Sequence, residues 1–579
     1  MHKTLLTVIT LFVSTLSFYG QTYITNVTIA DVEQHKFITH QTVEITDNSI
    51  SNIKKSKGFK IPENATIIDG TGKYLFPGLV DAHIHFFQNG GLYTRPDAID
   101  LRRFKNYDDE ISLAKLDMEN KLKRYLTNGI TTVIDVGANY HFLQQRNEFT
   151  SKADAPTIFI TGPLLTTFEP EVYEGLKENE PFTLTKTIED GIQGVRAQLK
   201  YKPDFIKIWY IAGADGLSIE ESARKNLPII KAAIDEAHKN NLKVAVHATQ
   251  RITAQLAVEN GADFLVHSVD DEALKEDFIS LMKSKNTILC PTLIVHSGYV
   301  NTFGQNLKLT NYELQTADPY QLGTLLDLKH LSDTTFVNNY KAYGNSERAL
   351  NGLKKADSIS MVNLKLLTDA GVTIATGTDA GNIGTLHASS YLSELKAMKK
   401  SGMTNWQIMQ ASTINGAKIL AKENELGSIS IGKKANLILL DANPIENIEH
   451  VTKINTVINK GQVFNPNTLL IDSPSDLAQR QLNAYNLRNI DAFLEPYADD
   501  VEIYAYPDKL LYTGKEIMRS QYASMFENTP NLHCELKERI VQGQIVIDKE
   551  RVQFGERILE AVAIYHIENH KIKKVYFIQ

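Results

Sequence analysis

The feature that most constrains the fold is a series of eight short apolar runs separated by longer segments, most of them amphipathic. The runs lie at residues 79–85, 130–136, 157–161, 205–209, 243–247, 264–266, 288–293 and 372–376. An apolar strand followed by an amphipathic helix, as at residues 229–240 after the fourth run, is typical of α/β folds with a parallel sheet. Eight such strands without a glycine-rich phosphate loop after the first favour a closed (β/α)8 TIM barrel over an open dinucleotide-binding sheet. We therefore predict a barrel over residues 76–421.

The segments that flank this region have a different pattern. Short alternating runs broken by polar turns precede it, and similar runs return after it, at residues 427–441 and 456–463. Such runs indicate strands without intervening helices. We predict one small β-sandwich domain built from residues 21–75 and 422–465. The long polar, tyrosine-rich interval between the seventh and eighth strands, about residues 295–369, predicts a helical excursion over the barrel mouth.

The tail follows a linker that contains Pro466, Ser473 and Pro474. Helical patterns cover residues 476–494 and 515–526, and an extended segment lies between them at residues 501–506. Long alternating runs then follow at residues 532–540, 544–554, 559–567 and 572–578. This order predicts a separate α+β domain over residues 475–579, of ordinary domain size.

The first residues have the pattern of an export signal. Lys3 is followed by a charge-free run over residues 5–18, with small or polar residues near position 20. We expect a signal peptide at residues 1–20, an exported protein (periplasmic or secreted) and no membrane span after its removal. A buried N-terminal strand or a membrane anchor is the alternative.

Charge and cysteine content argue against a nucleic-acid partner and against structural sites built from cysteine. The formal net charge is −7 without long single-sign runs, which argues against a nucleic-acid partner. Only two cysteines occur, Cys290 and Cys534, so neither a disulfide framework nor a cysteine zinc site is expected. A metal in this chain must use histidine, carboxylate or a modified side chain.

Five polar residues stand just past apolar runs, where the side chains of a barrel meet at its mouth. They are His83, His85, His247, His267 and Asp379. His83 and His85 are two apart on one strand and so face the same side. Each residue alone could be a turn residue, but together they predict a site for a divalent metal, for which we expect zinc.

Lys207 is the remaining candidate in the barrel. It lies in an apolar strand with Phe205 and Trp209 on its own face. An inward lysine is costly unless it is neutralised or bridged. A lysine that reaches the mouth or pairs with a carboxylate is the alternative.

Several motifs together resemble the amidohydrolase superfamily, in particular its imidazolonepropionase-like and metal-dependent dipeptidase branch. They are Pro-Gly-Leu-Val-Asp-x-His-x-His at residues 77–85, Gly-Thr-Asp-Ala-Gly at 377–381, and the segments 411–417 and 427–441. The resemblance covers roughly residues 22–465. By the order of its elements alone, the tail resembles the nuclear-transport-factor-2-like, or polyketide-cyclase-like, cone fold, which makes it a candidate for homo-oligomer formation.

The resemblance implies a role for each matched residue. His83 and His85 would hold the first metal, and His247 and His267 would be the ligands from the fifth and sixth strands. Asp379 would touch the metal and take the proton from the attacking water. The likeness implies that Lys207 is a carbamate that bridges two ions.

Two further positions, Thr249 and His387, have no single role implied by the resemblance. Many relatives have Tyr or His two places after the fifth-strand histidine, where this chain has Thr249. The donor to the scissile carbonyl is therefore not assigned. His387, soon after the eighth strand, is either a substrate contact or an ordinary helix residue.

The expected activity is hydrolysis of a carbon–nitrogen (amide) bond of a small substrate by metal-bound hydroxide, with Asp379 as proton shuttle. Export favours a dipeptide or acyl-amino acid, as in a prolidase. The alternatives are a mononuclear cyclic-amide hydrolase or deaminase, in which Lys207 would be structural, and a non-catalytic binding protein in which the cone domain carries the function.

Overall fold

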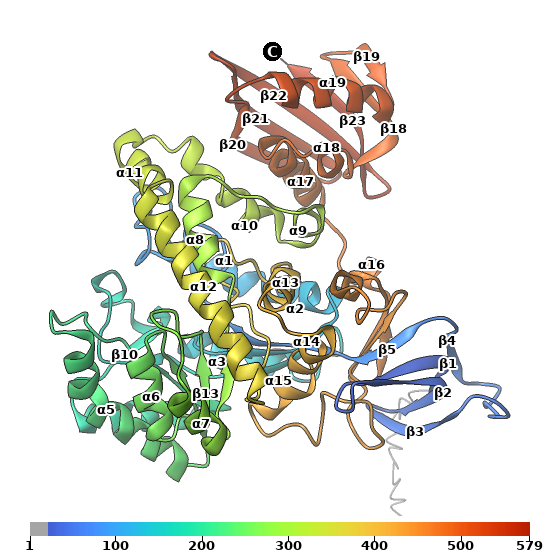
Figure 1. Cartoon of the computed structure of the whole chain (residues 1–579). Coiled ribbons are helices and arrows are strands. Elements are labelled where there is room, and N and C mark those ends of the chain that lie inside the picture. Colours follow the sequence, from blue (N-terminus) through green and yellow to red (C-terminus); the bar gives the residue numbers. More distant parts are fainter. Residues whose placement is uncertain (1–20, 579) are drawn as a thin grey trace, which may run out of the picture.

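The computed structural model describes residues 21–578 in three regions (Figure 1). They are a β-sheet domain, a TIM-barrel-like α/β region with a helical excursion, and a C-terminal α+β domain. The expected signal peptide at residues 1–20 lies outside the described residues. No helix within the described part of the chain has both the length and the apolar character needed to cross a membrane.

Both flanks of the barrel combine in one eight-stranded sheet, at the lower right of Figure 1. The N-terminal flank contributes β1 (Thr22–Asp31), β2 (Lys36–Thr46), β3 (Ser49–Lys55), β4 (Thr66–Asp69) and β5 (Tyr74–Pro77). The C-terminal flank contributes β15 (Leu437–Leu440), β16 (Ile454–Asn459) and β17 (Gln462–Phe464). The flanks join where β5 pairs antiparallel with β15. Because these strands form a single hydrogen-bonded sheet, the sandwich arrangement stays a prediction.

The barrel strands form two parallel ladders. The first contains β6 (Leu79–Ile84), β7 (Ile130–Asp135) and β8 (Thr157–Ile160). The second contains β9 (Leu164–Thr166), β10 (Phe182–Leu184), β11 (Phe205–Trp209), β12 (Lys243–His247), β13 (Phe264–Val266) and β14 (Ile288–Cys290). Seven of these strands match the predicted apolar runs, whereas the short strands β9 and β10 were not predicted.

The eighth predicted strand, residues 372–376, has no extended ladder of its own, but single hydrogen bonds place it in the ring. Three backbone hydrogen bonds from N–H to carbonyl connect the two ladders and this segment. Asp204 to Ile160 (3.0 Å) joins the start of β11 to β8, Leu289 to Thr373 (3.0 Å) joins β14 to the segment, and Ala82 to Thr376 (2.9 Å) joins β6 to the segment. The segment therefore lies between β14 and β6. The order of the ring is that of a TIM barrel.

Helices follow most barrel strands, as predicted. They are α1 (Tyr107–Leu116), α2 (Met118–Thr127), α3 (Tyr140–Phe149), α4 (Ile188–Leu199), α5 (Ile219–Lys239), α6 (Arg251–Glu259), α7 (Glu276–Lys285), α13 (Tyr391–Lys400), α14 (Asn405–Ala411) and α15 (Ile414–Lys418). The start of α5 is fixed by a capping box in which Ser218 and Glu221 satisfy each other's backbone N–H groups. The predicted helix 229–240 is the second half of α5.

Apolar side chains fill the inside of the ring below the mouth. This cluster contains Val80, Ala82, Ile134, Val136, Phe205, Ala245, Phe264, Val266, Ile288, Cys290 and Ala375, all buried. The inside of the ring below the mouth is therefore apolar, and the polar side chains of the same strands lie at their carboxyl ends.

The predicted excursion is helical. It contains α8 (Val295–Gly304), α9 (Asn311–Thr316), α10 (Pro319–Thr324), α11 (Thr334–Gly344) and the long α12 (Glu347–Asp369). Figure 1 shows it between the barrel and the C-terminal domain.

The C-terminal domain packs helices against one six-stranded sheet. The helices are α17 (Pro474–Asn486), α18 (Ile490–Leu494) and α19 (Lys515–Asn528), and the short α16 (Pro466–Leu469) precedes them. The sheet order is β19 (Lys509–Thr513), β18 (Tyr497–Ala505), β23 (Lys571–Ile578), β22 (Arg557–Glu568), β21 (Ile545–Phe554) and β20 (His533–Gln542). The predicted helix 476–494 is therefore two helices.

The C-terminal domain rests on the excursion through α17. Buried Arg480 donates hydrogen bonds to the carbonyls of Leu314 (2.9 Å) and Ala317 (3.1 Å). Asn483 donates to the carbonyl of Pro319 at 2.7 Å. Since apolar residues of both regions also belong to one buried cluster, the two share a core.

Candidate active site

A cavity of about 730 Å³ opens at the carboxyl ends of the barrel strands and beneath the excursion. Its lining contains five of the six predicted metal ligands: His85, Lys207, His247, His267 and Asp379. The sixth, His83, is fully buried next to them. The structure thus brings all six residues to one end of the barrel.

Three of these side chains form a tight cluster. The Nε2 atoms of His83 and His85 are 3.3 Å apart, and each lies 3.1 Å from Oδ1 of Asp379. One ligand atom from each residue lies within 4.8 Å of the others. His83 Nδ1 and Asp379 Oδ1 are buried without a hydrogen-bond partner among the described residues. Two imidazoles and a carboxylate with an unsatisfied oxygen fit a divalent metal ion.

Backbone contacts between β6 and the turn at residues 377–381 hold this cluster. The Asp379 N–H donates to the carbonyl of His83 at 2.7 Å. Beside it, the buried Asp81 carboxylate accepts from the Thr378 N–H (3.0 Å) and hydroxyl (2.7 Å). A Cβ on Gly377 would lie 2.4 Å from Cys290 Sγ, so only glycine fits at this close approach.

Two of the predicted ligands have a left-handed backbone. The φ angles are 75° at His267 and 57° at Asp379, and Thr292, which contacts His267, has φ 48°. Such conformations are unfavourable for residues other than glycine and often occur at functional sites. Here they direct side chains from strand ends into the cavity.

Hydrogen bonding and burial set the state of the imidazoles. His85 Nδ1 donates to the carbonyl of Gly137 at 2.9 Å, which leaves the Nε2 lone pair toward Asp379. Burial lowers the pKa of His83 to about 4, so this ring is neutral at pH 7. Neutral imidazole is the form that binds a metal.

The other three predicted ligands line the cavity beside this cluster. The ring centroids of His247 and His267 are 4.3 Å apart, and His267 Nδ1 lies 3.8 Å from Asp379 Oδ2. Lys207 is 1 % exposed and shares its strand face with Trp209, as predicted. None of the described carboxylates forms an ion pair within 4 Å of its amine, and burial lowers the pKa of Lys207 to about 7. The alternative of a carboxylate-paired lysine has no geometric support.

His387 lies outside this cavity. Its Nδ1 is 2.7 Å from the Tyr125 hydroxyl, and its Nε2 is 2.8 Å from the carbonyl of Gln88. Both ring nitrogens are therefore used by contacts within the protein, and burial lowers the pKa of this ring well below its usual value. The possible substrate role of His387 is not supported, because the ring is a structural bridge between α2 and the loop after β6.

Sequence reasoning missed a polar group on the cavity wall. Arg95 forms a bidentate ion pair with Asp97 at 2.8 and 2.6 Å and also donates to Asn382. The Tyr299 hydroxyl donates to the same Asn382 oxygen at 2.7 Å. Arg95, Tyr299 and Asn382 line the cavity, as does Thr249. They come from a loop, an excursion helix and a turn, and the only signal in the sequence is the weak Arg-x-Asp spacing.

Comparison with known proteins identifies both parts of the chain. A model of the amidohydrolase family matches residues 74–464, and a model of the SnoaL-like domain matches residues 478–575. The chain is 22% identical to a 5-methylthioadenosine/S-adenosylhomocysteine deaminase of Carboxydothermus hydrogenoformans, over 79% of this chain and 93% of that protein. It is 23% identical to an imidazolonepropionase of Geobacillus sp., over 69% of this chain and 82% of that protein.

Two further similarities concern a short segment and the fold. A 28% identical match to a 5'-deoxyadenosine deaminase of Methanobrevibacter smithii spans 25% of this chain and 35% of that protein. A solved Xaa-Pro dipeptidase with bound methionine is similar in fold, with a TM-score of 0.57 at 23% identity, over 77% of this chain and 100% of that one. Since the family model matches well over half of the chain, the chain belongs to the amidohydrolase family, whose members are metal-dependent hydrolases of carbon–nitrogen bonds.

Proposed function

We propose that this enzyme is exported and hydrolyses the amide bond of a dipeptide or acyl-amino acid. The observation that carries the proposal is the cluster of His83, His85 and Asp379 at the floor of a cavity of about 730 Å³. The walls combine the polar group around Arg95 with apolar and aromatic side chains, among them Phe87, Phe182, Trp209, Tyr299 and Phe303. Such a wall suits the side chains of a short peptide, and the volume suits a small molecule.

The bound ion and the residues of the chain would each perform a different part of the reaction. A bound divalent ion would supply Lewis acidity, which acidifies water and polarises a carbonyl. Asp379 would accept the proton of the attacking water and pass it to the leaving nitrogen, because its carboxylate lines the cavity beside His83, His85 and His267. Tyr299 is a candidate for the donor to the scissile carbonyl, on exchange of its hydrogen bond to Asn382, because it lines the same cavity as Thr249, which stands where many relatives have Tyr or His.

We also propose that the centre holds two zinc ions bridged by a carbamate on Lys207. The carbamate would form when the neutral amine attacks the carbon of carbon dioxide and one N–H proton passes to water, which leaves an anionic carbamate. Support comes from the burial of Lys207, its lack of an ion pair with any described carboxylate, and its position beside His247 and His267. A bridging anion would remove the cost of an unpaired amine at this depth.

The test is a side-by-side turnover assay of the zinc-loaded protein. Its arms are Xaa-Pro and other dipeptides, N-acyl amino acids, imidazolone-type rings, and 5'-deoxyadenosine-type nucleosides. We expect turnover of the dipeptides or acyl-amino acids. Turnover confined to the rings or the nucleosides would refute the peptidase proposal and leave family membership intact.

A mononuclear cyclic-amide hydrolase or deaminase is the second candidate. The relatives that align over most of their length are an imidazolonepropionase and a deaminase, and the tightest cluster contains three ligands. The ring and nucleoside arms of the same assay measure this alternative. Family membership sets aside the non-catalytic binding protein.

Localisation and assembly have separate tests. We infer export from residues 1–20 and homo-oligomer formation through the C-terminal domain from its SnoaL-like pattern. Fractionation of the producing cells tests the first, and sedimentation of the full chain tests the second. A cytoplasmic or strictly monomeric protein would refute the respective inference.

A further inference from the structure

A second cavity, of about 590 Å³, lies at the seam between the excursion and the C-terminal domain. The excursion lines it with Lys329, with His330 and with Lys341 of α11. The C-terminal domain lines it from the turn after α17, from β20 and from β21. None of its lining residues lines the active-site cavity.

The charge of this seam cavity is strongly unbalanced. Four cationic side chains line it, Lys329, Lys341, Arg488 and Arg551, against the single carboxylate of Glu535. That carboxylate is already within 3.0 Å of Lys537 and 3.5 Å of Arg551. Within residues 21–578 no carboxylate forms an ion pair with Lys329, Lys341 or Arg488. Three unpaired cations around one cavity repel one another unless an anion lies between them.

The pKa of Lys329 reflects this repulsion. Partial burial lowers it, and the neighbouring charges of Arg488 and Lys341 lower it further. Burial likewise lowers the pKa of Lys341. Lys329 and Arg488 are exposed and Lys341 is half-buried, so solvent screens part of the repulsion among these cations and an anion would relieve the rest.

The buried floor of the cavity carries an unpartnered polar atom. His533 is 8 % exposed, and its Nε2 lies 2.9 Å from Nδ1 of His330, with the two rings stacked at 5.2 Å. Its Nδ1 has no hydrogen-bond partner within the described chain. Burial, His330 and the two lysines lower the pKa of His533 to about 3, so the ring is neutral. When His330 donates to Nε2, the proton of His533 is on Nδ1, for which the described chain supplies no acceptor.

We propose that the seam cavity binds a small, doubly charged oxyanion, a phosphate or dicarboxylate group, between Lys329, Lys341 and Arg488 and above His533. A neutral N–H donor beside several ammonium and guanidinium groups is a set that recognises an oxyanion by charge and by hydrogen bonding. The ligand would cross-link the two regions, because Lys329 and Lys341 belong to the excursion and Arg488 and His533 to the C-terminal domain.

Such a ligand would also influence the active site, because α11 lines both cavities. Tyr340 and Tyr343 of that helix line the active-site cavity, whereas Lys341 lines the seam cavity. An anion held by Lys341 would therefore fix the position of a helix that covers the substrate.

The test is a calorimetric titration of the full-length protein after removal of metal by a chelator, so that no ion at the active site captures the anion. Inorganic phosphate and succinate are titrated separately, each at an ionic strength matched with sodium chloride. We expect one saturable site per chain. Lys341→Gln and Arg488→Gln should each weaken the binding at least tenfold, without a change in far-UV circular dichroism.

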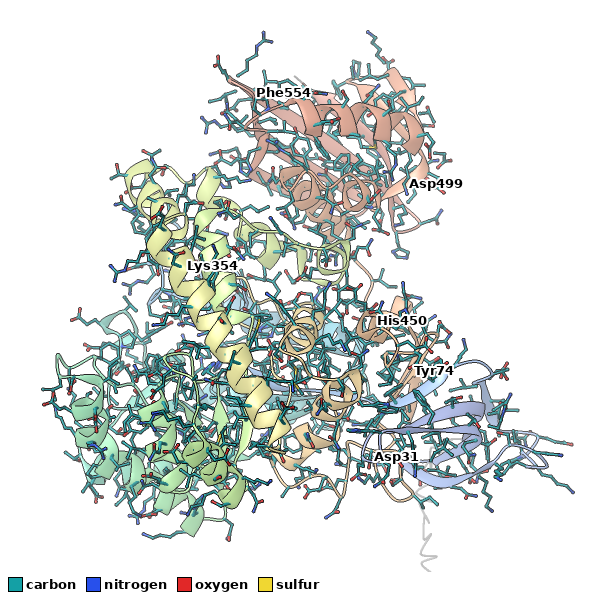
Figure 2. The ribbon with its side chains drawn as sticks, viewed as in Figure 1. Asp31, Tyr74, Lys354, His450, Asp499 and Phe554 are labelled. Carbon is teal, nitrogen blue, oxygen red and sulfur yellow. The ribbon has the colours of Figure 1, made fainter. Side chains whose placement is uncertain are left out.

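The matched control is Lys354→Gln. Lys354 is exposed on α12 and labelled in Figure 2, and it does not line the seam cavity. This variant removes the same charge and should bind as the unmodified protein does. Tighter binding of phosphate than of succinate would indicate a phosphate ester as ligand, and the reverse a dicarboxylate. Absence of saturable binding by both anions, or equal weakening by Lys354→Gln, would refute the site.

Discussion

Replacement of Asp379 by asparagine separates metal binding from proton transfer. The carboxylate oxygen Oδ1 lies 3.1 Å from both His83 Nε2 and His85 Nε2. An asparagine oxygen can take the same position as a neutral ligand, but its amide cannot accept the proton of an attacking water. Loss of general acid–base catalysis lowers turnover by about 10²–10⁴-fold, or about 3–5 kcal/mol in the activation free energy. We expect a kcat reduced by that factor with the metal content retained.

The assay combines kcat with metal analysis of the same preparation by mass spectrometry. The matched control is Asp357→Asn, since Asp357 also lines the cavity, from α12, but lies outside the ligand cluster. It should retain turnover within a few-fold. A kcat loss below tenfold in the metal-loaded Asp379→Asn protein would refute the proton-shuttle role. A loss fully restored by added zinc would instead make Asp379 a structural ligand.

Three further predictions concern the bridge, the domain contact and a buried acid. Lys207→Ala should lose metal together with turnover, as measured by metal analysis, and near-normal turnover with one tightly bound ion would contradict the binuclear proposal. Arg480→Met leaves Asp472 and two carbonyls of the excursion without their partner, so the free energy of unfolding in urea should fall by about 3 kcal/mol. A fall below about 1 kcal/mol would contradict the importance of this contact. Burial raises the pKa of Glu394 from 4.5 to about 8, so stability should fall as the pH rises through this window. Glu394→Gln should reduce that slope by about 1.4 kcal/mol per pH unit, and an unchanged slope in urea unfolding at several pH values would refute the raised pKa.

The sequence predicted seven of the barrel strands because an apolar run is visible wherever both faces of a strand are buried. It missed β9 and β10, whose three residues each include a threonine, whereas the equally short β13 was found because its three residues are all apolar. The eighth segment was predicted from its apolar run, although the structure gives it single hydrogen bonds instead of a ladder. The break between α17 and α18 was missed because the apolar pattern continues across it.

The candidate site was predictable where chemistry and strand ends coincide. His83, His85, His247, His267 and Asp379 each end a buried run, so fold geometry alone brings them together. The role of His387 could not be predicted in this way, because its partners, Tyr125 and the carbonyl of Gln88, are distant in the sequence and only the structure shows that they contact both ring nitrogens. The seam cavity was beyond prediction for a similar reason, since its cations come from elements far apart in the chain.

The contact between α17 and the excursion also determines the order in which the chain can fold during synthesis. The helices α9 and α10 have six residues each, below the length at which an isolated helix is stable in water. Their partner α17 leaves the ribosome only after the rest of the barrel and the second flank of the β-sheet domain, a delay on the order of ten seconds at about 5–20 residues per second. The contact with α17 is therefore completed last, and α9 and α10 are without their partner helix until the C-terminal domain has been made.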